Sequence, residues 1–390
     1  MRANGVEKYQ GMRQNIWLLP SDGDEEVDQM NTDVVDLRRE IRVGLIFTGQ
    51  GFQRIGMYRD LYDEYQEFRE TFEEGNGVLS YKLQNICFKQ TFMTRIETKL
   101  EHISERAGHF FEEMIKVPKI HQTIFTQPII CAGDIGCFRV LLKEVPGLDY
   151  HVIAGHSLGE YPAFIAAGAL NFKDGMKVVK KRGEYMHDVS NHIDSGLLAI
   201  VSKQGRIPRS YIERLCRKYY VNLALHNSDS VYVVGGLNDN LRKLADEVRR
   251  KKRFTPLPVQ VSGAFHTYLM QPAAEKLKKD LERITFKRAQ TPIIANTTSE
   301  SISNPQHIKA EAYRQLTQTV IWRDILWRMY QSGINLIIEL GMGSTQRGNG
   351  SALSKYTRQT YPADQLPEIL TVEDKPSLDH TKRRLKELGF

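Results

Sequence analysis

The stretch VIAGHSLGEYPAF, residues 152–164, joins an apolar run to a glycine-flanked serine and an alanine-rich segment. The residues YHVIAG are typical of a buried strand, whereas LGEYPAFIAAGAL is typical of a helix. Ser157 lies at the join, with Gly155 two residues before it and Gly159 two residues after it. The stretch therefore predicts a strand, a very tight turn and a helix, with the serine at the apex of the turn.

A turn this tight needs small residues at the two glycine positions, because larger side chains there would collide. The turn exposes the Ser157 hydroxyl above the sheet, with the first amide groups of the helix behind it, ready to stabilise a developing oxyanion. This geometry is a nucleophile elbow. The alternative is a chance G-x-S-x-G pattern in a glycine-containing loop, and the strand before it and the helix after it favour the nucleophile.

Composition indicates a soluble globular protein. The chain has 390 residues, of which 41% are hydrophobic and 26% are charged, enough for one large domain with an insertion or for two domains. It contains no run of 18 apolar residues and no apolar secretion signal, so we expect no membrane span and a cytoplasmic location, with an organelle as the alternative. The four cysteines lack C-x-x-C spacing, which argues against a metal site or a disulfide framework.

The rest of the chain divides into segments that differ in polarity and in the spacing of their apolar residues. Residues 1–40 are mostly polar and predict a leader or linker, and IRVGLIFTGQG then begins a buried strand that runs into a glycine turn. Within 92–118 the apolar residues recur at intervals of three and four, which predicts a helix, and 125–144 predicts another. Residues 366–390 are expected to form a C-terminal tail.

Residues 193–257 have a different pattern. SGLLAIVS, VNLALHN, DSVYVVGG and FTPLPVQV predict strands, and IPRSYIERLCRKYY and NDNLRKLADEVRRKK predict helices, the second capped by Asn238 or Asp239. The order β-α-β-β-α-β is that of a small ferredoxin-like unit. Because long helices and the buried strand INLIIELG follow, we expect this unit to be inserted into a larger α/β core made of 41–192 and 258–365.

A serine nucleophile needs a base, and histidine is the first residue type to consider. Of the eleven histidines, His266 stands in VQVSGAFHTYLMQPAAEKL, where a strand, a turn of small residues and a helix follow one another. The setting resembles that of Ser157 and predicts the base. The alternative is a surface histidine without a role.

These motifs together resemble the acyltransferase family that contains malonyl-CoA:acyl carrier protein transacylases and the acyltransferase domains of polyketide synthases. The resemblance covers about residues 41–350 and is carried by FTGQGFQRIGM, FTQPII, GHSLGEYPAF, KKRGEYM, VSGAFHTYLMQPA, YRQLTQTVIW and IIELGMG, in the family's order. It implies a large α/β core related to hydrolases with an inserted ferredoxin-like subdomain.

The resemblance also implies site roles. Ser157 takes the acyl group, His266 is its general base, and an acceptor at Gln315 orients the imidazole in place of a carboxylate. Gln50 matches the residue whose backbone amide forms the oxyanion hole together with that of Leu158. These assignments make a dyad rather than a triad.

Arg182 matches the arginine that pairs with the free carboxylate of malonyl, a task suited to a planar guanidinium. Its alternative is a solvated residue in a lysine-rich helix. Gln127, Asn227 and His156 match polar pocket positions. Phe265 fits malonyl-selective members, because a bulky ring crowds an α-methyl branch, although one methyl group changes binding by only about 1–3 kcal/mol.

The implied function is transfer of a malonyl group from malonyl-CoA to the phosphopantetheine thiol of an acyl carrier protein, through an acyl-serine intermediate, for fatty acid or polyketide synthesis. No cofactor is expected, because the CoA thioester is a substrate. Three alternatives stay open: a serine thioesterase or acyl hydrolase, an acyltransferase with another acyl-CoA preference, and a non-catalytic scaffold of a synthase complex.

Charge gives an independent indication of the partner. Residues 192–257 contain 13 Lys and Arg against 6 Asp and Glu, a net +7 that equals that of the whole chain. An acidic carrier protein and the phosphates of CoA would both be attracted to the basic 193–257 subdomain. The run RRKKR at 249–253 is alternatively a solvated helix end. Nucleic-acid binding lacks a motif, and a monomer is expected.

Overall fold

The computed structural model describes residues 40–88, 118–343 and 351–390. Within it, Ile41–Phe390 forms one compact unit. The predicted leader at 1–40 and the predicted helix at 92–118 lie outside the described residues, apart from one residue of each.

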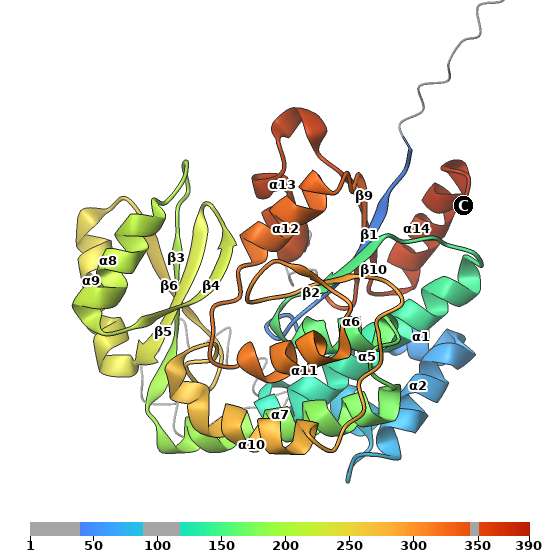
Figure 1. Ribbon diagram of the computed structural model, residues 1–390, viewed down its shortest axis with the longest axis horizontal. Helices are drawn as coiled ribbons and strands as arrows, with labels where there is room; N and C mark the ends of the chain where they lie inside the picture. The colour runs from blue at the N-terminus through green and yellow to red at the C-terminus, as the bar shows by residue number, and fades with distance from the viewer. Residues whose placement is uncertain (1–39, 89–117, 344–350) are drawn as a thin grey trace, which may run out of the picture. The chain divides into compact units, whose positions relative to one another are not determined.

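A six-stranded sheet forms the centre of this unit (Figure 1), in the order β10-β9-β1-β2-β7-β8. Its strands are parallel except for β8, which pairs antiparallel with β7. Every residue of β1, β2 and β9 is buried, which agrees with their continuous apolar sequences. The strands are β1 (Val43–Phe47), β2 (Val152–Gly155), β7 (Ile293–Ile294), β8 (Ser301–Ile302), β9 (Leu336–Leu340) and β10 (Glu368–Val372).

Three neighbouring strands bring distant segments of the chain to one edge of the sheet. Phe47 of β1 pairs with Gly155 of β2, and Ile153 of β2 pairs with Ile293 of β7, all in parallel. The residues that follow these strands therefore leave the same carboxyl edge. That edge is where open α/β sheets bind their ligands.

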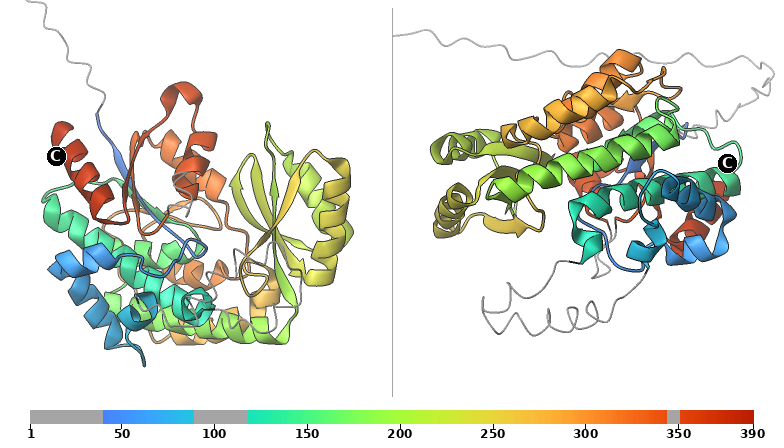
Figure 2. Two further views of the ribbon diagram at one scale, coloured as in Figure 1. Left: turned by 180° about the vertical axis from the view of Figure 1, so that it is seen from behind. Right: turned by 90° about the horizontal axis from the view of Figure 1, so that it is seen from below.

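Helices pack around the sheet (Figures 1 and 2). The longest helix, α5 (Thr123–Glu144), is long and apolar enough to cross a membrane. However, 83% of its apolar stretch is buried inside the protein. It therefore forms part of the core. The other helices of the large core are α1 (Arg59–Glu64), α2 (Gln66–Asn76), α3 (Leu83–Cys87), α6 (Glu160–Ala166), α7 (Phe172–His192), α10 (Gln271–Leu281), α11 (Pro305–Arg314), α12 (Trp322–Gln331), α13 (Ala352–Thr360) and α14 (Lys375–Glu387).

Between β2 and β7 the chain builds a second sheet in the predicted β-α-β-β-α-β order. Its four strands are antiparallel, in the order β4-β5-β3-β6, and its two helices lie on one side of the sheet (Figure 1). The elements are β3 (Ser195–Val201), α8 (Arg209–Tyr219), β4 (Asn222–Ser228), β5 (Val231–Leu237), α9 (Asn238–Lys251) and β6 (Thr255–Val259).

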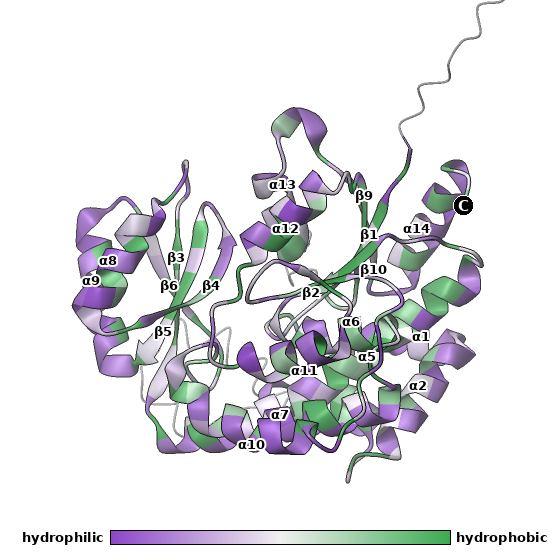
Figure 3. Ribbon diagram, viewed as in Figure 1, coloured by the Kyte–Doolittle hydropathy of each residue, from purple (hydrophilic) through white to green (hydrophobic). Residues whose placement is uncertain are grey.

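The two faces of the second sheet bury different surfaces. Leu198, Ile200 and Val234 join a small core with the apolar faces of α8 and α9. On the other face, Leu197 and Val233 belong to the main hydrophobic core. The outward surfaces of α8 and α9 are largely hydrophilic (Figure 3), as their sequences require.

Backbone hydrogen bonds also join the second sheet to the large core. The His226 amide donates to the Val320 carbonyl at 2.9 Å, and the Val320 amide donates to the Ala224 carbonyl at 3.0 Å. The segment after α11 thus adds a short strand-like pairing to the edge of β4. This pairing fixes the segment that follows Gln315.

The structure corrects three predictions of local structure. Residues 366–390 are not a tail: β10 pairs along its whole length with β9, and Asp374 and Ser377 form a capping box for α14. Helix α9 has no side-chain cap, because its N-cap position is Leu237, which has no polar side chain; the side chain of Asn238, the first helical residue, donates from Nδ2 to Asp194 Oδ1 at 2.5 Å. The helix after Ser157 is a 3₁₀ turn followed by α6, which ends at Ala166.

Candidate active site

The tight turn after β2 has the predicted geometry. Ser157 has a left-handed backbone with φ of 55°. A Cβ atom on Gly155 would lie 1.9 Å from the Gly159 carbonyl oxygen, and one on Gly159 would lie 2.3 Å from the Thr48 carbonyl oxygen. Both positions therefore accept only glycine, and the turn packs directly against the end of β1.

His266 lies against the serine. Its Nε2 atom is 2.6 Å from Ser157 Oγ, and its Nδ1 atom is 2.5 Å from the main-chain oxygen of Gln315. A carbonyl oxygen can only accept, so Nδ1 carries the proton and Nε2 accepts the hydrogen bond of the serine hydroxyl. The structure thus brings together the predicted nucleophile, the predicted base and the predicted orienting residue.

The surroundings of His266 favour its neutral form. Burial, followed by the nearby Arg182 cation, lowers the pKa of His266 to about 3, and the side chain is only 3% exposed. A neutral imidazole in contact with a hydroxyl can accept the hydroxyl proton at neutral pH.

Arg182 is a buried cation on α7. It is 1% exposed, its guanidinium lies 5.5 Å from the centre of the Tyr161 ring, and its Nη2 donates to Gln315 Oε1 at 2.9 Å. Nε has no acceptor among the described residues, and no described carboxylate is close enough to Arg182 to form an ion pair. A buried cation without a counter-charge is unfavourable on its own, and a bound anion would offset that cost.

Glu160 is the carboxyl group whose charge acts on Arg182. Burial, followed by repulsion from Glu311, raises the pKa of Glu160 well above its usual value, which favours the neutral acid. Glu160 Oε1 accepts the Asn296 amide at 2.8 Å. Glu160 therefore acts in the local hydrogen-bond network and leaves Arg182 without a full counter-charge.

The side chain of Gln315 connects the cation to the elbow. While Oε1 accepts from Arg182, Nε2 donates to the Ser157 carbonyl at 3.0 Å. Gln315 is completely buried. Sequence reasoning assigned to it only the orientation of His266, which the main-chain oxygen performs.

The predicted oxyanion-hole amides lie at the same sheet edge. Gln50 follows β1 and Leu158 follows the nucleophile, and in the described part of the chain neither main-chain N–H donates to a protein acceptor. The Gln50 side chain is held at 3.3 Å by Thr123 Oγ1. Two such amides near the serine are suitable donors for an oxyanion.

The predicted pocket residues have varied surroundings. His156 Nε2 contacts Asn227 Oδ1 at 2.9 Å, and Phe265 is buried directly before His266 in the chain. Gln127 is buried on α5 and donates to Met186 Sδ at 3.4 Å, so its hydrogen bond is to α7 and not to the dyad. Its Oε1 is buried without a partner among the described residues.

Asn296, after β7, was not singled out by sequence reasoning. Its Oδ1 accepts the Ser157 amide at 2.8 Å, and its Nδ2 donates to the Gly155 carbonyl at 2.7 Å. One side chain thus holds both sides of the strained turn. The available signal was the sequence PIIAN, in which a polar residue directly follows a short apolar run.

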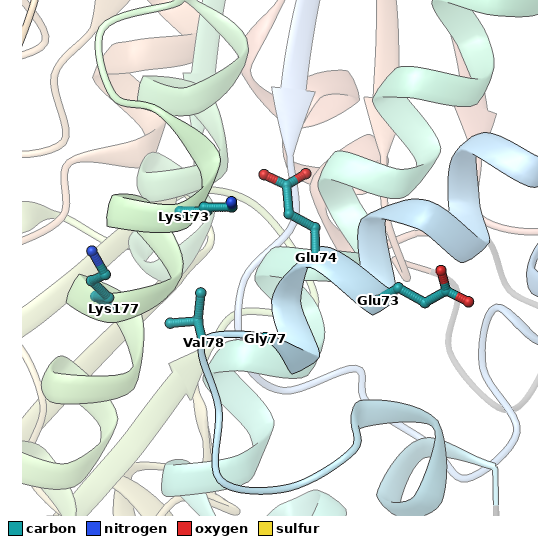
Figure 4. A pocket seen from close by; sticks show the side chains of 6 residues that line it. All are labelled: Glu73, Glu74, Gly77, Val78, Lys173 and Lys177. Atoms are coloured by element: carbon teal, nitrogen blue, oxygen red, sulfur yellow. The ribbon is translucent and has the colours of Figure 1, made fainter.

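A surface hollow of about 440 Å³ lies elsewhere, between α2 and α7 (Figure 4). Its lining mixes acidic and basic side chains and contains none of the predicted site residues; it consists of Glu73, Glu74, Gly77, Val78, Lys173 and Lys177. Among the described residues, no group of three His, Cys, Asp or Glu side chains could hold a metal ion.

Comparisons with known proteins identify the family of this chain. The profile of the family described as acyl transferase domain matches residues 45–355. Malonyl CoA-acyl carrier protein transacylase of Bacillus subtilis (strain 168) is 28% identical over 308 residues, which cover 79% of this chain and 89% of that protein.

Solved structures are similar over most of their length. The malonyl CoA-acyl carrier protein transacylase of Clostridium perfringens has a TM-score of 0.73 and 27% identity, covering 89% of this chain and 98% of that one. A malonyl-transacylase in complex with its type II PKS acyl-carrier protein also has a TM-score of 0.73, with 25% identity over 88% of this chain and 99% of that one.

Proposed function

The chain belongs to the acyl transferase domain family, and on that premise we propose that it is a malonyl-CoA:acyl carrier protein malonyltransferase. It moves a malonyl group from malonyl-CoA to the phosphopantetheine thiol of an acyl carrier protein in fatty acid or polyketide synthesis. Relatives named malonyl CoA-acyl carrier protein transacylase match most of the chain.

The observation that carries this proposal is the pairing of a serine–histidine contact with an unpaired buried cation. Ser157 and His266 supply a nucleophile and a neutral base, as in other acyl transfers. Arg182 supplies a buried guanidinium that lacks a carboxylate among the described residues. An acyl group with a free carboxylate, such as malonyl, satisfies this cation.

The first half of the reaction loads the serine. His266 Nε2 takes the hydroxyl proton as Ser157 Oγ attacks the thioester carbonyl, and the oxyanion accepts hydrogen bonds from the amides of Gln50 and Leu158. The C–S bond then breaks, and the CoA thiolate leaves with the proton from His266. The product is malonyl-O-Ser157.

The second half reverses the chemistry with another thiol. The phosphopantetheine thiol of the carrier protein gives its proton to His266 and attacks the ester, and Ser157 leaves with that proton. No cofactor takes part in either half. The carboxylate on Arg182 keeps the acyl group fixed for the incoming thiol, which favours transfer over hydrolysis.

Two observations disfavour the alternatives from sequence. A serine hydrolase of the Ser, Asp, His type places a carboxylate on the histidine, whereas His266 Nδ1 contacts the Gln315 carbonyl. A non-catalytic scaffold has no need of a hydroxyl 2.6 Å from an imidazole. These contacts support the transferase, and the finer preference among acyl-CoA donors follows from Arg182 and Phe265.

The test is intact-mass measurement after mixing the protein with malonyl-, methylmalonyl- or acetyl-CoA. We expect a malonyl adduct, formed faster than the other two, that transfers to a holo acyl carrier protein and is absent in Ser157→Ala. Free malonate in place of malonylated carrier protein would identify a hydrolase. No adduct with any acyl-CoA would identify a scaffold.

We place carrier-protein docking on the basic subdomain 193–257. Its surface carries exposed basic residues at the end of α9 and beyond, namely Arg249, Arg250, Lys251, Lys252 and Arg253. Charge reversal of Arg250 and Lys252 should raise KM for the carrier protein more than KM for malonyl-CoA. Reversal of the exposed Arg383 and Lys386 on α14 is the control, and an equal effect of both pairs would refute this placement.

Two finer points complete the proposal. The large core is of hydrolase-like type. The inserted unit is ferredoxin-like, and its strand order β4-β5-β3-β6 supports this assignment. A cytoplasmic location is supported by the free thiols of all four cysteines.

A further inference from the structure

We propose that the side-chain amide of Gln315 is a specificity-determining positioning group, which holds Arg182 in place without neutralising it. This inference rests on the proposed function of Arg182 as the carboxylate-binding residue. It concerns the side chain alone, since the main-chain oxygen of Gln315 is what contacts His266.

The geometry gives the amide two partners of opposite type. Arg182 Nη2 can only donate, and it lies 2.9 Å from Oε1. The Ser157 carbonyl can only accept, and it lies 3.0 Å from Nε2. A side-chain amide accepts at one end, donates at the other and stays neutral at every pH at which the protein is folded.

Neutrality matters because Arg182 is buried. A carboxylate at position 315 would have the same shape but would form an ion pair with Arg182 inside the protein, and such charge pairs are strong. It would compete with the carboxylate of the substrate and repel it. It would also lose the donor to Ser157. The amide therefore orients the cation while leaving its charge available.

Through its two hydrogen bonds, Gln315 links the two protein groups that contact opposite ends of the malonyl group. The carboxylate end contacts Arg182, and the reacting carbonyl lies at Ser157. Gln315 joins these two groups through one rigid amide. This side chain therefore holds the Arg182 guanidinium in a fixed position relative to the main chain of the nucleophile.

The experiment compares acyl-enzyme formation from malonyl-CoA and acetyl-CoA, by rapid quench and intact mass, in wild type, Gln315→Met and Gln315→Glu. Met removes both hydrogen bonds without adding charge, and Glu adds the competing charge. We expect the malonyl-to-acetyl ratio of kcat/KM to fall in the order wild type, Met, Glu, with a fall of about 100-fold for Glu. Gln318→Glu, an exposed neighbour, is the matched control and should leave the ratio unchanged.

A neutral fluorophosphonate reports the condition of the dyad separately, because it reacts with the activated serine and has no carboxylate. We expect Gln315→Glu to lose far more malonyl loading than fluorophosphonate labelling. Equal losses of both, or an unchanged ratio in Gln315→Glu, would overturn this inference. If wild type itself shows no preference for malonyl, the proposed function fails instead, and the two failures are distinguishable.

Discussion

Asn296 Oδ1 accepts the main-chain N–H of Ser157 at 2.8 Å, across 139 residues of sequence. The contact matters because Ser157 has a left-handed backbone, a conformation that costs about 1–3 kcal/mol in a non-glycine residue. The same side chain donates to the Gly155 carbonyl at 2.7 Å. Asn296 thus holds the strained turn from the neighbouring strand.

Replacing Asn296 with Ala should slow acylation of Ser157 by about 10- to 100-fold, because the turn loses both hydrogen bonds and the hydroxyl loses its fixed position. Asn296→Asp retains the acceptor and should lie between Ala and wild type. The measurement is the rate of malonyl adduct formation at saturating malonyl-CoA.

A stability control separates positioning from folding. Asn304 accepts the Gln306 amide at 2.8 Å as the N-cap of α11, and Asn304→Ala should reduce the free energy of unfolding by about 1 kcal/mol without slowing acylation. If both variants lose activity in proportion to their stability, Asn296 has no specific role at the turn.

The low pKa of His266 predicts an acylation rate that changes little with pH. Because the pKa is lowered to about 3, the imidazole stays neutral and kcat/KM should be flat from pH 8 down to pH 5. An ordinary histidine would lose its base form below pH 6.5. A decline in the rate of Ser157 acylation with a midpoint near pH 6.5 would contradict the buried neutral base.

The same pKa affects stability with a defined sign. A histidine whose pKa is lower in the folded state binds its proton more readily when unfolded, so its contribution to stability is present above pH 6.5 and is lost as the pH falls towards 3.

Arg182→Gln removes a cation that lowers the pKa of His266. That variant should move the loss of acylation to a higher pH than in wild type.

Arg182 should control which acyl group is loaded. In Arg182→Ala the malonyl-to-acetyl ratio of kcat/KM should fall by about 100-fold or more, because the substrate carboxylate is left without its cation. Arg182→Lys should fall less, since it keeps the charge but loses the two parallel hydrogen bonds. Lys181→Ala, the exposed neighbour on α7, is the control. An unchanged ratio in Arg182→Ala would remove the assignment of this residue to the carboxylate.

Sequence reasoning predicted the elbow well because its requirements are local and steric. Gly155 and Gly159 are forced by contacts within a few ångströms, and the apolar run and helix on either side can be seen in the pattern. The β-α-β-β-α-β order was predicted for the same reason, since each element has its own periodicity. The C-terminal strand was missed because β10 is only partly buried at the sheet edge, and its pattern is weak.

The contacts within the site were harder to predict from the sequence. Ser157 and His266 are 109 residues apart, and in sequence they were linked by their similar strand-turn-helix settings and by the resemblance to a family. The role of Asn296 and the bond between Gln315 and Arg182 depend on which strands are neighbours. The β1-β2-β7 order is a property of the folded sheet, and no local pattern encodes it.

A buried acid at the end of β9 provides a prediction that does not depend on the active site. Glu339 is completely buried and accepts hydrogen bonds from Ser351 and from Ser354 Oγ, the latter at 2.9 Å. Burial raises the pKa of Glu339 to about 7, despite the two hydroxyl donors, and Glu373 adds to the rise by repulsion. The folded protein therefore holds this proton more tightly than the unfolded chain does.

A raised carboxyl pKa stabilises the folded state below the unfolded value of about 4.5, and that contribution is lost as the pH rises through 7. Glu339→Gln keeps the shape without the titration, so relative to wild type it should gain about 3 kcal/mol in the free energy of unfolding between pH 4.5 and pH 8. Urea denaturation of wild type and variant at several pH values measures this difference. Both proteins contain the same histidines, so the effect of histidine titration on stability cancels between them. The exposed Glu275→Gln on α10 should show no such trend. A difference between Glu339→Gln and wild type that is constant with pH would mean that the pKa of Glu339 is the same in the folded and unfolded protein, and that its serine partners offset its burial.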